Sequence, residues 1–161
     1  MTHDDLVRRG ADWLRKNHHY RYRSQIVLTE FVTYADETPD VFGMSESHTN
    51  LIECKVSLAD FKADMKKRCR GKVAHLGNWR MYLCPAGLIP IELVPADWGL
   101  LYCHDKKITI EKHPLDHNEP DVRAAEYHIL YSIARRALID GLLESLLRTA
   151  KQRGKNGSVS P

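Results

Sequence analysis

The sequence predicts an α/β fold in which a mixed β-sheet is flanked by helices, with an added strand pair and a long C-terminal helix. Segments with helical spacing of apolar residues alternate with short runs of β-branched and aromatic residues. Residues that favour turns separate these segments. The length of 161 residues and the hydrophobic content of 43% suit one domain with a sizeable core, which we place at residues 1–152.

The first half of the chain predicts one helix, three strands and a second helix. Residues 2–16 carry a helical apolar stripe, and Thr2 with Asp5 forms a capping-box pattern. Strands are predicted over three segments, 25–34, 39–44 and 50–56. The second helix covers residues 57–69, where a buried side is formed by Leu58, Phe61 and Met65, and Asp60 and Asp64 are assigned to the other side.

The second half predicts further strands and a long helix. The strands are expected at 79–84, 99–104 and 108–112, the last two as a pair joined by a turn. A helical pattern then covers residues 121–151, and Gly141 inside it marks either a break or a close packing contact. The Gly/Ser/Lys-rich tail at 153–161 is predicted to be disordered.

The composition favours a cytoplasmic protein with a mild positive charge. The formal net charge is +3, which fits nucleic acid as a partner without requiring it. No apolar run approaches the roughly 20 residues of a membrane span, so no membrane association is expected. The N-terminus lacks the pattern of a signal peptide. Four cysteines without a close pair favour reduced, structural thiols over a zinc site.

Two acids and a lysine on neighbouring predicted strands are the candidate active site. Glu53 and Lys55 are two residues apart, so they point to the same face of a strand. Asp40 joins them if the segments at 39–44 and 50–56 are adjacent. Two carboxylates can hold a hard divalent cation, which polarises a phosphodiester and lowers the pKa of a bound water. The alternative is a surface hairpin whose outward positions are Glu and Lys.

The residues Asp40, Glu53, Cys54 and Lys55 resemble the signature of the PD-(D/E)XK nuclease superfamily. The stretch from Glu53 to Lys66 is similar to the MmcB-like DNA-repair nucleases within it, as are residues 5–14 and 91–101. The resemblance implies a restriction-endonuclease-like αβββαβ core, Mg²⁺ or Mn²⁺ as cofactor, and DNA as substrate. It also implies a further metal ligand, the backbone carbonyl of Cys54.

A third acid is usual in the superfamily that this chain resembles. Glu30, on the predicted strand 25–34, is the first candidate, and an exposed strand acid is the equally weighted alternative. The acids of the first helix are its rivals: Asp4, Asp5 and Asp12.

Two basic clusters are candidate nucleic-acid contacts. The first follows the motif and comprises Lys62, Lys66, Lys67, Arg68, Arg70 and Lys72. The second lies between the first helix and the first strand and comprises Arg15, Lys16, Arg21 and Arg23. Tyr20 and Tyr22 interleave with the second cluster and are expected to permit stacking on bases. A solvated face is the alternative for a charge run.

The function that these observations predict is metal-dependent hydrolysis of phosphodiester bonds in DNA, in repair, recombination or phage and defence DNA processing. One alternative is a catalytically inactive nuclease-fold module that binds nucleic acid or a protein partner, because a fold does not imply a function. Another is an unrelated α/β protein with a coincidental motif. A homodimer is compatible with the sequence.

Overall fold

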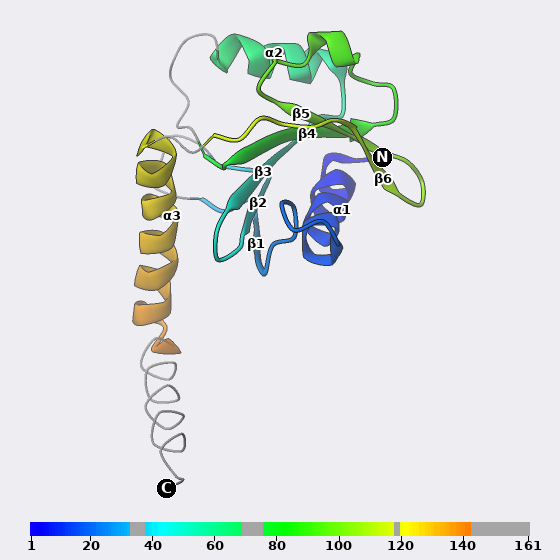
Figure 1. Cartoon of the computed structure of the whole chain (residues 1–161). Coiled ribbons are helices and arrows are strands. Elements are labelled where there is room, and N and C mark those ends of the chain that lie inside the picture. The colour runs from blue at the N-terminus through cyan, green and yellow to red at the C-terminus, as the bar shows by residue number, and fades with distance from the viewer. Residues whose placement is uncertain (33–37, 69–75, 118–119, 143–161) are drawn as a thin grey trace, which may run out of the picture.

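The computed structural model describes residues 1–32, 38–68, 76–117 and 120–142, with the backbone alone described at residues 67, 68, 120 and 121 (Figure 1). The elements follow the predicted order of helix, three strands, helix, three strands and helix. They are α1 (His3–Lys16), β1 (Ile26–Thr29), β2 (Val41–Met44), β3 (Thr49–Cys54), α2 (Leu58–Arg68), β4 (Trp79–Pro85), the short 3-10 helix η1 (Ile91–Leu93), β5 (Gly99–Cys103), β6 (Ile108–Lys112) and α3 (Pro120–Ile139).

The six strands form one mixed sheet in the order β1-β2-β3-β4-β5-β6. The first three strands form an antiparallel meander, β3, β4 and β5 run parallel, and β6 returns antiparallel to β5. The predicted mixed sheet and the added strand pair are therefore confirmed. Because β3, β4 and β5 are parallel, their carboxyl ends lie at the same end of the sheet.

Each face of the sheet has its own hydrophobic core, because successive strand residues point to opposite faces. On one face the helix α1 packs over β1, β2, β3 and β4. Leu6 and Leu14 of α1 join Ile52 and Leu83 in one buried cluster. The other face is covered by α2, by the η1 segment and by the start of α3. The second core lies there, and its members include Phe42, Phe61, Tyr82, Trp98 and Ile129.

The capping prediction for the first helix is confirmed. The Thr2 hydroxyl accepts a hydrogen bond from the backbone N–H of Asp5, and the Asp5 carboxylate accepts one from the backbone N–H of Thr2. Both bonds satisfy N–H groups that a helix start leaves without partners. At α2 the Ser57 hydroxyl accepts from the backbone N–H of Asp60 in the same way. These caps fix where α1 and α2 begin beside the candidate site.

The strands predicted at 25–34 and 39–44 are shorter in the structure. β1 ends at Thr29, so Glu30 is not a strand residue. It has a φ of 47°, in the left-handed region, and its N–H donates to the carbonyl of Asp40 at 3.0 Å. The chain therefore turns out of the sheet at Glu30, whereas a pattern of β-branched residues continues past that point. Residues 33–37 lie outside the described part of the chain.

The last helix also ends earlier than its apolar pattern predicts. α3 stops at Ile139, and Gly141, with a φ of 69°, donates its N–H to the carbonyl of Leu138. A glycine in the left-handed region is a common helix terminator, so the break alternative at Gly141 is confirmed. The predicted continuation to residue 151 and the tail at 153–161 lie outside the described residues. No helix within the described ranges has both the length and the apolar character needed to cross a membrane.

Candidate active site at the carboxyl end of β3

The structure places Asp40 next to Glu53. In the antiparallel pair β2–β3, Val41 faces Ile52 and Phe42 faces Leu51, so one more step of this register aligns Asp40 with Glu53. Asp40 precedes β2 by one residue, and its Oδ2 accepts a hydrogen bond of 2.7 Å from the backbone N–H of Cys54. This bond holds the Asp40 carboxylate at the end of β3, where the sequence predicts it.

Glu53 and Lys55 point to the same side, as the strand period predicts. The Nζ of Lys55 donates to Oε2 of Glu53 at 3.4 Å, and only 6% of Lys55 and 7% of Glu53 are exposed. Lys55 follows the last residue of β3, but its backbone N–H donates to the carbonyl of Leu83 in β4 at 2.9 Å. The neighbouring strand therefore holds the lysine in place although the predicted strand to Val56 ends at Cys54.

A third carboxylate, from Asp64 in α2, reaches the same lysine. Its Oδ1 lies 3.7 Å from Nζ of Lys55, and its Oδ2 accepts a hydrogen bond of 3.0 Å from the hydroxyl of Tyr82. The assignment of Asp64 to the side of the helix away from the core is wrong. Asp64 lies one turn after the buried Phe61, and that spacing is the signal that places it toward the sheet.

The carboxylates around Lys55 keep it charged. Burial lowers the pKa of Lys55, but the nearby carboxylates of Glu53, Asp64, Asp60 and Asp40 outweigh burial and raise that pKa above its ordinary value. Lys55 is therefore an ammonium at neutral pH. An ammonium fixed between two carboxylates can stabilise developing negative charge or orient a water molecule.

Cys54 points away from the acids, as predicted. It is 1% exposed and belongs to the core under α1. Burial, followed by the charges of Asp40 and Glu53, raises the pKa of its thiol well above the ordinary value. A neutral buried thiol is a poor nucleophile, so Cys54 has a structural role through its side chain. Cys84 and Cys103 are likewise buried and free.

The start of α1 brings additional ligand types to Asp40. Nε2 of His3 lies 3.3 Å from Oδ1 of Asp40. His3, Asp4 and Glu30 each have a ligand atom within 4.8 Å of the others. Glu30 thus lies beside Asp40, the place expected of a third acid, although not on a strand. Sequence reasoning missed His3, because its partners are distant in sequence.

The structure separates the rivals of Glu30 on α1. Asp4 lies with His3 and Glu30, whereas Asp5 caps the helix. Asp12 is two turns further along and forms ion pairs with Lys16 at 3.2 Å and Arg15 at 3.5 Å. Asp12 therefore serves α1 itself rather than the candidate site.

The oxygen donors of this site fit a hard divalent cation. Asp40 and Glu53 present carboxylates from adjacent chain segments, and carboxylate oxygens are the ligands that Mg²⁺ and Mn²⁺ prefer. The backbone of Cys54 lies against Asp40, so its carbonyl belongs to the same neighbourhood. The residues that would hold such an ion are Asp40 and Glu53, with Glu30 and the Cys54 carbonyl as further donors.

The predicted nucleic-acid contacts are only partly described. Lys62 and Lys66 are exposed on α2, while the side chains of Lys67 and Arg68 and all of Arg70 and Lys72 lie outside the described residues. In the second cluster, Arg21 and Arg23 are exposed. The guanidinium of Arg21 lies 5.7 Å from the ring centre of Tyr20 and donates to its hydroxyl.

Tyr22 is not available for stacking on bases, and that expectation is wrong. It is 1% exposed, and its hydroxyl forms a hydrogen bond of 2.8 Å with Nδ1 of His113. Its ring packs against Trp13, with the ring centres 5.4 Å apart. The alternation of Tyr and Arg at 20–23 therefore reflects one side chain packed inward and its neighbours facing solvent.

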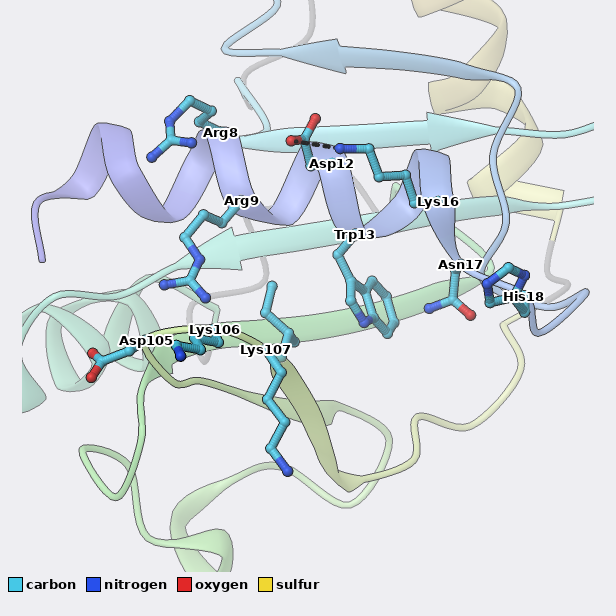
Figure 2. Close-up of a pocket in the computed structure, with 11 residues that line it drawn as sticks. Arg8, Arg9, Asp12, Trp13, Lys16, Asn17, His18, Asp105, Lys106 and Lys107 are labelled. Atoms are coloured by element: carbon cyan, nitrogen blue, oxygen red, sulfur yellow. Dashed lines mark hydrogen bonds and ion pairs between the residues drawn. The ribbon is translucent and has the colours of Figure 1, made fainter.

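Sequence reasoning also missed a basic cleft between α1 and the turn that joins β5 to β6. The cleft has a volume of about 690 Å³ (Figure 2). Its cationic side chains are Arg8, Arg9, Lys16, Lys106 and Lys107. Only Lys16 belongs to a cluster recognised from sequence. The two sides of the cleft, α1 and the β5–β6 turn, are about 95 residues apart in the chain, so the sequence does not show that their cations meet.

Comparisons with known proteins give a structural relative but no family. No family model matches the chain, and no curated protein matches it. Among solved structures, the SPO1766 protein of unknown function from Silicibacter pomeroyi is similar, with 26% identity and a TM-score of 0.59. The likeness covers 88% of this chain and 94% of that chain, so it extends over nearly the whole of both molecules.

Proposed function

We propose that this protein is a metal-dependent nuclease that hydrolyses phosphodiester bonds of DNA. The observation that carries the proposal is the meeting of Asp40, Glu53 and Lys55 at one end of β3. Two carboxylates and a buried ammonium are the minimum equipment for this chemistry. The order from α1 to β4 agrees with the restriction-endonuclease-like core that the PD-(D/E)XK resemblance implies, and we propose that core for this chain.

Each residue of the site has a separate task in this proposal. Asp40 and Glu53 would hold Mg²⁺ or Mn²⁺, and such an ion would supply polarisation of the phosphodiester and a lowered pKa for a water. Lys55 holds a positive charge beside the phosphate and orients the attacking water. Asp64 and Glu53 hold the Lys55 ammonium in position from two sides. Asp64 acts through the lysine and is therefore a positioning residue.

The test is incubation of the full chain with single-stranded and double-stranded DNA in Mg²⁺ or Mn²⁺, with EDTA as the control. Cleavage that needs the metal and disappears in the Glu53→Gln variant supports the proposal. An absence of cleavage on both substrates in both metals, with a folded protein, contradicts it. Because the proposed settings are DNA repair, recombination and phage or defence DNA processing, substrates with nicks and flaps belong in the same assay.

The second candidate is a nuclease-fold module that binds DNA without cutting it. One observation favours it: both carboxylate oxygens of Asp40 already have protein partners, Cys54 on Oδ2 and His3 on Oδ1. A metal ion has to displace or share one of these partners. DNA binding without metal-dependent cleavage would select this candidate over the first.

A further inference from the structure

The basic cleft is built from two parts of the chain that are distant in sequence. Arg9 of α1 donates a hydrogen bond through its Nη2 to the carbonyl of His104, at the start of the β5–β6 turn. This contact fixes α1 beside the turn. In Figure 2, Arg9 and Trp13 point from α1 toward the turn, and Lys106 and Lys107 lie across the cleft from the helix.

The cleft carries an excess of positive charge. Five Lys and Arg side chains line it, against the two carboxylates of Asp12 and Asp105. Two of the five cations are paired, Lys16 with Asp12 at 3.2 Å and Arg8 with Asp5 at 3.5 Å. The excess charge therefore comes from Arg9, Lys106 and Lys107 against Asp105. The Arg9 contact is with a neutral carbonyl, so it anchors the guanidinium without cancelling its charge. Such a concentration of cations attracts a polyanion and holds phosphates.

An aromatic side chain lies among these cations. Trp13 lines the cleft and is half-buried, and its ring packs on that of Tyr22, which supports it from behind. An indole stacks on any base, but only when the base is unpaired and turned out of a helix. Cations around a supported aromatic ring are the features of a surface for single-stranded nucleic acid.

The β5–β6 turn, which lines the cleft, lies at the end of the sheet that carries the candidate site. The β5–β6 turn follows the carboxyl end of β5, and Glu53 and Lys55 are at the carboxyl end of the parallel strand β3. Only β4 separates β3 from β5, a spacing of about 10 Å for two strand intervals. The N-terminal end of α1 meets the same site, because His3 contacts Asp40. A polymer lying along α1 would therefore reach Asp40 first. It would then have to cross the end of β3 to meet Glu53 and Lys55, whose side chains lie on the face opposite to Cys54 and α1.

We propose that the cleft between α1 and the β5–β6 turn binds single-stranded DNA, with phosphates on Lys106 and Lys107 and a base on Trp13, and leads the strand to Asp40, Glu53 and Lys55. This inference rests on the proposed nuclease function for its choice of polymer. From His3 to Lys16, α1 is about 20 Å long, enough for a few nucleotides.

The experiment measures binding of a labelled oligothymidylate to the full chain by fluorescence anisotropy in EDTA, so that no cleavage occurs. The Lys106→Gln/Lys107→Gln variant should raise Kd, and the slope of log K against log salt should become shallower by about 1.4, or 0.7 for each phosphate that the variant no longer neutralises. Trp13→Ala should raise Kd by about 5- to 150-fold, and Trp13→Phe should restore much of the affinity.

A charge-matched variant tests the rival surface on α2. Lys62→Gln/Lys66→Gln removes two exposed charges from the other face of the sheet. A larger loss of affinity in the cleft variant than in this one supports the proposal, and an equal or smaller loss overturns it. Binding of a duplex as tight as that of the single strand, with Trp13→Ala without effect, also overturns it. Circular dichroism of each variant confirms that it is folded.

These outcomes separate the cleft from the nuclease proposal. Weakened binding in the cleft variants, without any cleavage by the wild type, would leave the cleft supported and the nuclease contradicted. Metal-dependent cleavage by the wild type, with cleft variants that bind and cut as the wild type does, would support the nuclease and contradict the cleft.

Discussion

Asp64 of α2 lies 3.7 Å from the ammonium of Lys55, which follows β3, so the helix after the motif contributes to the site that the motif begins. The Tyr82 hydroxyl, from β4, holds the other oxygen of Asp64 at 3.0 Å. Three consecutive elements, β3, α2 and β4, are thereby joined around one lysine. The position of that lysine depends on the packing of α2 on the sheet.

The two acids are predicted to be needed for metal binding. Asp40→Asn keeps an oxygen that can accept the hydrogen bond from Cys54 but removes the charge, and Glu53→Gln removes the charge beside Lys55. Each variant should lose metal-dependent cleavage, and calorimetric titration with Mn²⁺ should show weakened binding. Glu92→Gln, an exposed acid in η1, is the control. Cleavage near the wild-type rate by either site variant would rule out this metal site.

Lys55 is predicted to affect rate far more than metal affinity. Lys55→Ala removes the ammonium that we propose faces the phosphate, and the rate should fall by about 10²–10³-fold, as for one preorganised group that stabilises charge. Mn²⁺ affinity should stay close to that of the wild type, because the carboxylates remain. If titration shows that metal binding disappears while turnover is preserved, the assigned role is wrong.

Asp64→Asn is predicted to lower the pKa of Lys55. Burial still lowers this pKa in the variant, while one of the carboxylates that raise it is gone. The alkaline limb of the cleavage profile should therefore move to lower pH. Asp60→Asn should cause a smaller shift, since the charge of Asp60 acts on Lys55 less strongly than that of Asp64. Identical profiles for wild type and Asp64→Asn would contradict the positioning role.

The same pair predicts how stability changes with pH. The folded-state pKa of Lys55 is raised above its ordinary value of 10.5, so its ion pairs stabilise the fold fully below that value. This contribution disappears as the pH rises through the raised pKa. In urea unfolding, the stability difference between wild type and Asp64→Asn should be largest near neutral pH and should shrink on the alkaline side. A difference that grows with pH would contradict the sign.

Gly43→Ala is predicted to destabilise the core under α1. A Cβ at Gly43 would lie 2.8 Å from Cδ1 of Leu14 and 2.8 Å from Cβ of Ser24. Relieving such close approaches in a packed core costs about 1–3 kcal/mol. Gly10→Ala is the comparison, because its nearest neighbour is 3.1 Å away, at the end of the Leu83 side chain, and alanine favours a helix. Urea unfolding should show a larger loss of stability for Gly43→Ala than for Gly10→Ala.

The sequence alone determined the order of elements, the cap of α1 and the core of the site. The Thr2–Asp5 cap needs only residues three apart. The Glu53–Lys55 pair follows from the strand period, and Asp40 joins it because a short connection makes β2 and β3 neighbours. Each of these features depends on the spacing of residues that are close in the chain, and that spacing is given directly by the sequence.

Tertiary packing decided the features that join distant segments. The spacing from Phe61 turns Asp64 toward the sheet, but only the packing of α2 on the sheet brings Asp64 to Lys55. Tyr22 lies between two exposed arginines in sequence, a position typical of an exposed side chain. Packing against Trp13 and His113 nevertheless buries it. The basic cleft exists because Arg9 meets His104 across 95 residues. Contacts of this kind depend on how helices pack against the sheet, and no periodicity along the chain specifies them.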